Sequence, residues 1–349
     1  MAFHYTVRWA PPADSDAHLA PGALFANVEP LYYGWVGVEL FFVISGFVIL
    51  MTLENTSNGR DFVVRRFARI WPALIVATLI TSAVVMAVGP ADWRVNAYDV
   101  IDSIVLVGPD IVQWVLHYDV RYVDGAYWSL WVEVRFYVLA VLVYYATRGR
   151  FLAAWIGFQV VAFATALLSP GAVFNALFFP KHLPYFTLGM CLYKLRGGEE
   201  RKLAWLGVVI AAGAIMGGAL SGSFDSGVPG VAIENERLAL AGINLGIFVL
   251  LWLFLIDSRV IGVLASRPAV RLGQASYSLY LLHQNLGVTV IRVGIGMGIP
   301  YLAMLPITVA LVIGLALLML DLVEKPGKRA IIAALSSRPM KPVSGREAK

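Results

Sequence analysis

Long uninterrupted apolar runs are the feature that most constrains what this chain can fold into. The stretches 74–88 and 307–320 contain no charged residue. A helix needs about 20 apolar residues to cross a hydrocarbon core roughly 30 Å thick, and a backbone in lipid must satisfy its own hydrogen bonds. The strands of a membrane barrel alternate apolar and polar residues, and these runs do not alternate. The runs therefore predict transmembrane α-helices.

The charge content supports this interpretation. Only 14% of the 349 residues are charged and 59% are hydrophobic, whereas a soluble domain carries about 25% charged residues. The net charge is +5, which fits basic cytoplasmic loops of a membrane protein better than a nucleic-acid partner. The single cysteine, Cys191, excludes a disulfide within the chain and a thiolate metal cluster.

The fold class that we predict is all-α, a polytopic transmembrane helix bundle. The weaker run 101–117 contains Asp102, Pro109 and Asp110, so it predicts a re-entrant or interfacial piece and no crossing. Nine full spans are predicted, at 34–53, 70–89, 128–146, 151–168, 183–195, 203–220, 238–256, 273–293 and 301–322.

The positions of Lys and Arg predict which side of the membrane each loop faces. Basic residues follow the first span and recur in the loops near 148–150, 196–202 and 259–271 and in the tail, so we expect these segments in the cytoplasm. The chain then starts outside, and residues 1–7 resemble the end of a helix whose beginning is missing. The complete form would have about ten spans.

Ionisable residues inside apolar spans are candidates for function because they are costly to insert. Glu39 lies near the outer end of the first span, where it is either a site residue or an interfacial carboxylate that reaches water. Glu133 and Arg135 lie within another span. They are two residues apart and point to different sides of the helix, so each needs a partner elsewhere.

An arginine face is predicted at the cytoplasmic start of the second span. Arg66 and Arg69 are three residues apart and share one side of a helix. Such a face can clamp phosphates through paired hydrogen bonds. The alternative is a plain positive-inside anchor, which the spacing alone favours.

Histidines provide the remaining polar candidates. His283 lies in a span with serine, tyrosine, glutamine and asparagine side chains, where interhelical hydrogen bonding is an equal alternative to function. His4 lies near the outer end of the incomplete first helix. No His, Asp or Glu spacing indicates a metal site.

Taken in order, these motifs resemble the acyltransferase-3 family of bacterial membrane O-acyltransferases. The resemblance runs from His4 to about Pro326. Its further motifs match Gly37 to Phe47, Arg66 to Pro72, Trp128 to Tyr137, Ser276 to His283, and Glu324 with Pro326. The family also has an arginine some ten residues before the first-helix histidine, which would fall upstream of Met1. This departure suggests a start assigned too late or a truncated chain, and it puts activity in doubt if Met1 is the true start.

The resemblance implies transfer of an acyl group, usually acetyl, from acyl-CoA to a hydroxyl of a cell-envelope glycan or similar acceptor. It implies an enzyme of the bacterial inner membrane, with acyl-CoA as the donor substrate and no bound cofactor. Residues 1–330 would form the acyltransferase domain, and residues 331–349 a basic, disordered cytoplasmic tail.

Physical roles follow for the candidate residues, and, if the motifs share one cavity, the acyl group would cross the membrane through the protein. A sugar hydroxyl that attacks a thioester needs a base near neutral pH. We expect His4 to act as the general base and Glu39 to orient that histidine. Glu133 would position the acceptor or a water molecule. Arg66 and Arg69 would bind the donor phosphates, and Ser276 and Tyr277 would line the donor path.

Two other functions remain open from the residues. A transporter or flippase of a glycan or lipid-linked precursor would also use charges inside the membrane and glycine-rich helices. A non-catalytic remnant is the third possibility, because of the missing start.

Overall fold

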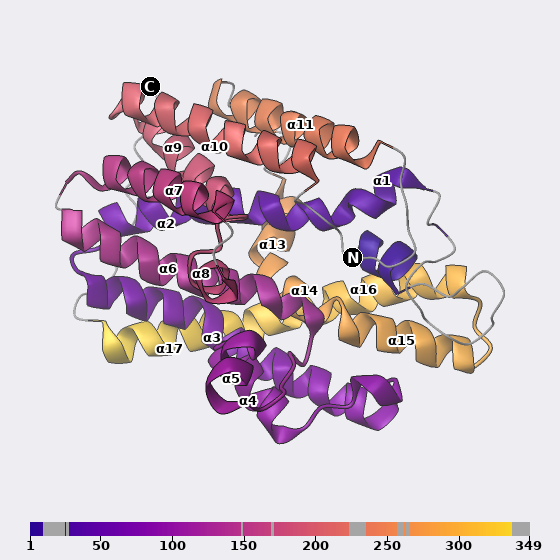
Figure 1. Ribbon diagram of the computed structural model, residues 1–349. Helices are drawn as coiled ribbons and strands as arrows, with labels where there is room; N and C mark the ends of the chain where they lie inside the picture. Colours follow the sequence, from indigo (N-terminus) through magenta and orange to yellow (C-terminus); the bar gives the residue numbers. More distant parts are fainter. Residues whose placement is uncertain are drawn as a thin grey trace.

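The computed structural model describes residues 1–9, 25, 28–147, 149–168, 171–222, 235–256, 262 and 266–336. Every regular element in these ranges is a helix. Figure 1 shows the long helices lying roughly side by side in one bundle. The prediction of an all-α transmembrane bundle is confirmed.

Six helical segments of the described chain are long and apolar enough to cross a membrane. They comprise α1 to α2 (Glu29–Tyr32 and Gly37–Glu54, joined by a 3-10 turn), α3 (Gly59–Val88), α6 (Trp128–Thr147), α10 (Arg201–Ser221), α11 (Glu236–Ile256), and α16 continued by a π-helical turn into α17 (Tyr301–Met319 and Lys325–Leu335). Two predicted spans are shorter, α7 (Phe151–Leu167) and α9 (Leu183–Gly197).

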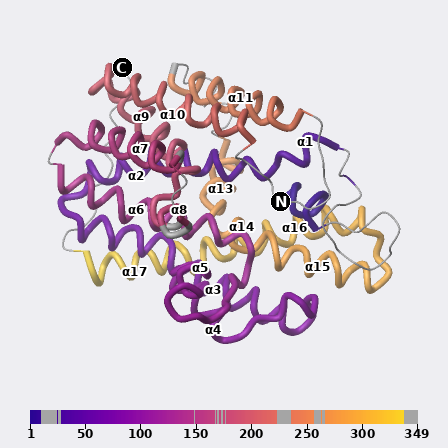
Figure 2. Tube along the Cα trace, viewed as in Figure 1, coloured from indigo at the N-terminus to yellow at the C-terminus, as the bar shows by residue number. Residues whose placement is uncertain are grey.

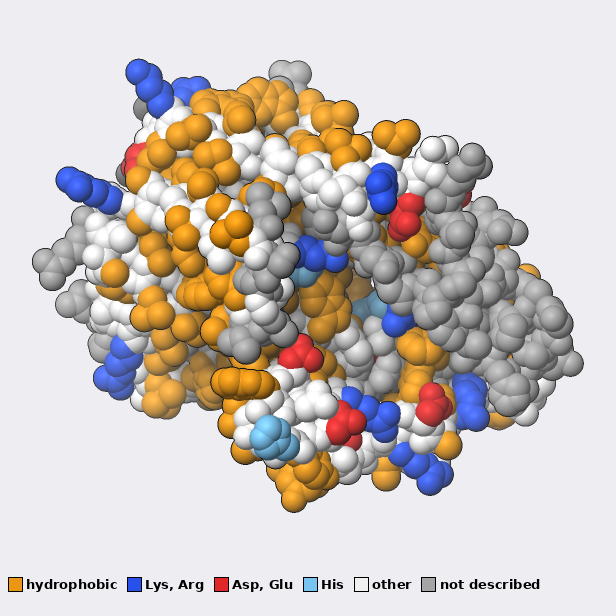
Figure 3. All heavy atoms as spheres, in the orientation of Figure 1, with side chains coloured by type: hydrophobic (Ala, Val, Ile, Leu, Met, Phe, Trp, Pro, Cys, Tyr) orange, Lys and Arg blue, Asp and Glu red, His pale blue; other side chains and the backbone are white. Residues whose placement is uncertain are grey.

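The outer surface of the bundle is apolar. Leu142 on α6, Val209 on α10 and Leu245 on α11 are among the exposed large hydrophobic side chains. Figure 3 shows hydrophobic side chains over much of the visible face. Such an apolar surface is suited to contact with the hydrocarbon core of a membrane.

In the upper part of Figure 1, helix α9 packs against α2, α7 and α10. Two glycines allow α2 and α9 to approach backbone to backbone. A Cβ added to Gly189 would lie 1.9 Å from the carbonyl oxygen of Val43, and one added to Gly46 would lie 2.1 Å from that of Phe186. Small residues at helix contacts are typical of membrane bundles.

The weak apolar run 101–117 forms two short helices, α4 (Ala97–Val105) and α5 (Pro109–Leu116). Leu106 and Gly108 both have positive φ, which ends α4 and turns the chain. Neither helix approaches the length of about 20 residues that a crossing needs. The tube in Figure 2 shows α4 and α5 at one edge of the bundle, next to α3.

The predicted span 273–293 is not one continuous helix, which corrects the expectation. The chain forms α13 (Arg267–Gln274), α14 (Ser276–Leu282) and α15 (Asn285–Gly296), with a break at His283 and Gln284. Apolar content predicts only that a segment enters the membrane, and the break depends on partners from elsewhere in the chain.

Those partners satisfy the backbone groups that the break leaves unpaired. Asp124 accepts a hydrogen bond of 2.8 Å from the N–H of Asn285, the first residue of α15, and another of 2.8 Å from the N–H of Ala126. The hydroxyl of Tyr5 donates to the carbonyl of His283. Burial raises the pKa of Asp124 to about 7, against these two N–H donors, which lower it. A broken helix inside a membrane protein is stable only with such replacements.

The last helix extends past residue 330, the predicted end of the acyltransferase domain. Helix α17 continues to Leu335, and the hydroxyl of Ser336 donates a hydrogen bond of 3.3 Å to Asp61 on α3. The remainder of the expected tail, residues 337–349, lies outside the described residues.

Candidate active site

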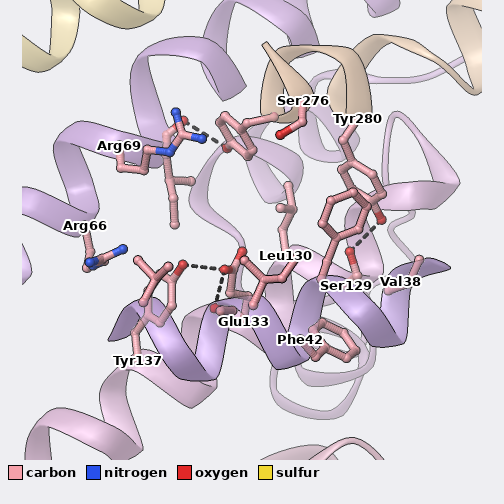
Figure 4. Close-up of a pocket in the computed structure, with 16 residues that line it drawn as sticks. Val38, Phe42, Arg66, Arg69, Ser129, Leu130, Glu133, Tyr137, Ser276 and Tyr280 are labelled. Atoms are coloured by element: carbon pink, nitrogen blue, oxygen red, sulfur yellow. Dashed lines mark hydrogen bonds between the residues drawn. The ribbon is translucent and has the colours of Figure 1, made fainter. Parts of the chain in front are cut away.

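A cavity of about 210 Å³ lies between α2, α3, α6 and α14. Five of the seven predicted site residues line it, namely Arg66, Arg69, Glu133, Ser276 and Tyr277. They come from three helices that are far apart in the sequence. Figure 4 shows the two arginines on one side of the cavity, Ser129 and Tyr280 on the other, and Glu133 between them.

The two arginines of α3 share a face, as their spacing predicts, but they have different partners. Arg69 forms an ion pair with Glu324, whose side chain is only 3% exposed, and its guanidinium lies 5.3 Å from the ring centre of Tyr277. Arg66 donates a hydrogen bond to the hydroxyl of Thr52 and packs over the ring of Tyr137. Arg66 therefore keeps its charge available, while that of Arg69 is opposed by a buried carboxylate.

Further cations surround this arginine face. Lys328 on α17 interacts electrostatically with Arg65, Arg66 and Arg69. Helix α17 comes close to α3 because Gly327 has no side chain: a Cβ there would lie 2.7 Å from Pro72. The Nε atoms of Arg65 and Arg66 are buried and have no hydrogen-bond partner among the described residues. A multiply charged anion would complement such a cluster.

Glu133 lies at the middle of the cavity wall. It accepts a hydrogen bond of 2.7 Å from Ser45 and another from the hydroxyl of Tyr137. Arg135, two residues along α6, points elsewhere and packs over the rings of Trp131 and Phe179. The expectation that Glu133 and Arg135 have separate partners agrees with these contacts.

The opposite end of the cavity is formed by Ser129 and Tyr280, whose hydroxyl oxygens are 2.5 Å apart. Tyr280 also donates to the carbonyl of Ala126. Ser129 and Tyr137 lie eight residues apart on α6, which at 1.5 Å per residue gives the cavity a depth of about 12 Å. The cavity thus extends along α6 from the cationic cluster to a pair of hydroxyls.

His4 does not line the cavity. One residue, His283, lies between His4 and Tyr280, which is part of the cavity wall. The ring centre of His4 is 4.9 Å from that of His283, and the ring of His283 is 5.4 Å from that of Tyr280. The Nδ1 atom of His4 is buried and unpartnered among the described residues. In turn, Nδ1 of His283 lies 2.6 Å from the carbonyl oxygen of Tyr280.

The expected pairing of Glu39 with His4 is not found among the described contacts. Oε1 of Glu39 lies 3.3 Å from Nδ1 of His182, the residue before α9. The sequence did not indicate this pair, because the two residues are far apart in the chain. His182 lies in a loop, and only the packing of α9 against α2 brings it close to Glu39.

Sequence reasoning therefore missed several residues that surround the site. Ser129 and Tyr280 lie within the motifs Trp128 to Tyr137 and Ser276 to His283, but neither was singled out as a site residue. Lys328 and His182 had no sequence signal beyond residue type, because their significance depends on contacts between distant helices. No cluster of three or more His, Cys, Asp or Glu side chains suited to a metal ion occurs in the described part of the chain.

Comparisons with known proteins identify the family of the chain. A family described as an acyltransferase domain, the acyltransferase-3 family, matches residues 1–321. The acyltransferase MdmB of Streptomyces mycarofaciens is 27% identical over 312 residues, which is 79% of this chain and 76% of that protein. The peptidoglycan O-acetyltransferase OatA of Listeria monocytogenes is 28% identical over 152 residues, 39% of this chain but 24% of that protein.

No solved structure matches the chain. The family match covers the residues of α2, α3, α6 and α14 that line the cavity, and His4 as well. Since that match extends over most of the sequence, the chain belongs to the acyltransferase-3 family and is a membrane acyltransferase.

Proposed function

We propose that this protein transfers an acyl group, acetyl in the first instance, from acyl-CoA to a hydroxyl of a cell-envelope glycan or similar acceptor. The observation that carries the proposal is the cavity itself, which leads from a cationic cluster on α3 and α17 to the hydroxyls of Ser129 and Tyr280 about 12 Å away. A cavity that is cationic at one end and lined by hydroxyls at the other suits a donor with an anionic end and a reactive thioester end.

The donor's phosphates would bind at Arg66, with Arg65, Arg69 and Lys328 adding to the positive field. Guanidinium groups bind phosphate oxygens in pairs, and burial strengthens the attraction. Ser276 and Tyr277 line the path that the pantetheine arm would take toward Glu133. We infer that this end of the cavity opens to the cytoplasm, where acyl-CoA is found and where the positive-inside rule places the arginines.

The reaction needs one proton acceptor. The acceptor oxygen forms the new ester bond to the thioester carbon, the carbon–sulfur bond breaks, and the thiolate of CoA leaves. His4, whose buried Nδ1 has no partner among the described residues, takes the proton of the acceptor hydroxyl. Glu133, with its hydrogen bonds from Ser45 and Tyr137, orders the polar groups around the reacting atoms.

The acceptor class follows from the relatives and is part of the proposal. OatA is named for its action on peptidoglycan, so a polyhydroxylated envelope polymer is the acceptor that we expect. The corresponding location is the bacterial inner membrane, with the acyl group passing outward through the protein.

The test compares donors with and without phosphates. The purified full chain is assayed with acetyl-CoA and with S-acetyl-pantetheine, which lacks the nucleotide and its phosphates. Arg66→Ala should raise the KM for acetyl-CoA by about 10- to 100-fold, the loss of one or two charge-assisted hydrogen bonds, and should change the KM for S-acetyl-pantetheine far less. Arg60→Ala, at an exposed position of the same helix, is the matched control.

His4→Gln tests the other end of the cavity. It should lower kcat with both donors by at least 100-fold. Equal effects of Arg66→Ala on both donors would remove the phosphate site from the proposal, and full activity of His4→Gln would remove the base.

A transporter of a glycan precursor is the rival, and the break between α14 and α15 is the feature that favours it. In transporters, the free N-terminus of such a half-helix faces the substrate. Here Asp124 already occupies the N-terminus of α15. Direct binding of acetyl-CoA, measured by calorimetry, separates the two functions because a transporter has no need of that donor.

A further inference from the structure

A histidine–carboxylate pair, Glu39 with His182, lies beside the cavity and has no part in the mechanism above. Glu39 on α2 is 3% exposed, and its Oε1 lies 3.3 Å from Nδ1 of His182. Oε2 of Glu39 and Nδ1 of His182 are both buried and make no hydrogen bond among the described residues, so the 3.3 Å contact is an ion-pair contact that leaves both of these polar atoms unsatisfied. A buried carboxylate is costly in an apolar surrounding, so its retention here calls for a role.

Aromatic side chains connect this pair to the cavity wall. The ring of His182 lies 5.3 Å from that of Phe42 and 5.3 Å from that of Trp128. Phe42 lines the cavity, as does Ser129, the neighbour of Trp128. Figure 3 shows histidine and basic side chains in a hollow between the upper and lower helices, open to the surface. The pair is therefore at the hydroxyl end of the cavity, away from the cationic cluster.

The chemistry of the pair differs from that of His4. The negative charge of Glu39, 3.3 Å from Nδ1 of His182, favours the neutral imidazole that carries its proton on that nitrogen and leaves the lone pair of Nε2 free to accept a hydrogen bond. The nearest ring to His4 is that of another histidine, His283, which supplies no negative charge. His182 is thus the more strongly oriented acceptor of the two.

We propose that His182, oriented by Glu39, binds a second hydroxyl of a carbohydrate acceptor while His4 deprotonates the hydroxyl that reacts. The proposal rests on the function proposed above and adds the substrate class that this end of the cavity selects. Trp128 and Phe42 flank the ring and offer apolar faces to a sugar, whose C–H groups pack on aromatic rings. No proton is transferred at His182.

The test uses acceptors that differ in the number of hydroxyls. The full chain in detergent is assayed with acetyl-CoA and either methyl β-N-acetylglucosaminide or 1-propanol. His182→Phe keeps a ring between Phe42 and Trp128 but removes the hydrogen bond. The KM for the glycoside should rise about 10-fold, and the ratio of kcat/KM for glycoside over propanol should fall by the same factor, since 1.4 kcal/mol is tenfold.

Two further variants test whether Glu39 and His182 act as one unit. Glu39→Gln removes the orienting charge and should shift the ratio in the same direction. The double variant should be no worse than His182→Phe alone, because residues that act as one unit are not additive. His117→Asn, at an exposed histidine after α5, is the control and should match the wild type.

An unchanged glycoside-to-propanol ratio in His182→Phe would overturn the proposal. So would an equal loss with both acceptors together with a lower unfolding temperature, which would mark His182 as structural. If the wild-type protein turned over no acetyl-CoA, the proposed function would fail as well, whereas the first two outcomes leave that function intact.

Discussion

At the scale of single residues, Arg66 and Arg69 share a helix face but differ in what their removal would leave behind. Arg69 opposes Glu324, which is 3% exposed and otherwise accepts a hydrogen bond of 3.0 Å from Ser278. Arg66 has a hydroxyl as its described partner. Loss of one member of a buried ion pair strands the other charge, while loss of a cation beside a hydroxyl does not.

Arg69→Ala should therefore be a stability variant as well as an activity variant. We expect it to lower the free energy of unfolding by about 3 kcal/mol, and Arg66→Ala by less than 1 kcal/mol. Thermal unfolding in one detergent measures both. Glu324→Gln added to Arg69→Ala should recover much of the loss, because it removes the stranded charge. Equal unfolding temperatures for the two single variants would contradict this assignment.

At the scale of elements, the contact of α2 with α9 determines where Glu39 and His182 lie. Gly189 faces a backbone carbonyl of α2, and no small movement makes room for a methyl group there. Gly189→Ala should destabilise the protein by about 1–3 kcal/mol. Gly213→Ala on α10 is the control, since a Cβ there meets nothing within 4 Å and should stabilise the helix by up to ~1 kcal/mol.

The same experiment has an activity readout. Because the α2–α9 contact holds the Glu39–His182 pair, Gly189→Ala should lower glycoside acylation more than binding of acetyl-CoA. A Gly189→Ala protein as stable as Gly213→Ala would show that the two backbones separate at little cost.

The short helix α4 carries a carboxyl group whose titration should be visible in stability. Burial raises the pKa of Asp102 to about 6, against a smaller opposing contribution from the N–H of Gly108. Between pH 4 and pH 6 the folded protein then binds more protons at this site than the unfolded chain, so this contribution to stability falls as the pH rises and stays low above pH 6.

Asp102→Asn should remove this dependence. Relative to the wild type, its free energy of unfolding should gain about 1–2 kcal/mol on going from pH 4.5 to pH 8. Chemical unfolding at several pH values measures the difference. Parallel curves for the two proteins would mean that Asp102 is as hydrated in the folded state as in the unfolded chain.

At the scale of the whole molecule, the proposed mechanism requires that the two ends of the cavity face opposite sides of the membrane. Cys191 is fully buried, so single cysteines can be added on a background that a membrane-impermeant maleimide does not label. Ala91→Cys, before α4, should react in intact cells, and Arg60→Cys, at the start of α3, only after permeabilisation. The reverse pattern would turn the cationic cluster outward and exclude a cytoplasmic donor.

The whole molecule also explains why the site tolerates so many buried polar groups. Glu133 and Glu324 each have a partner on another helix, and Glu39 has one in the loop before α9. A bundle whose lipid-facing surface is apolar can enclose such groups only where several helices meet, and the cavity lies at that meeting point.

The sequence by itself determined the fold class, most of the spans, the non-crossing piece near 101–117 and the arginine face, because these follow from local apolar length and helical spacing. It also assigned seven residues to one site, and five of them line the cavity. Only the tertiary structure decided that α14 and α15 are separate, that Glu39 faces His182, and that Lys328 joins the arginines. Each of these depends on contacts between segments far apart in the chain, such as Asp124 at the start of α15 and Gly327 against Pro72, and no local pattern encodes such contacts.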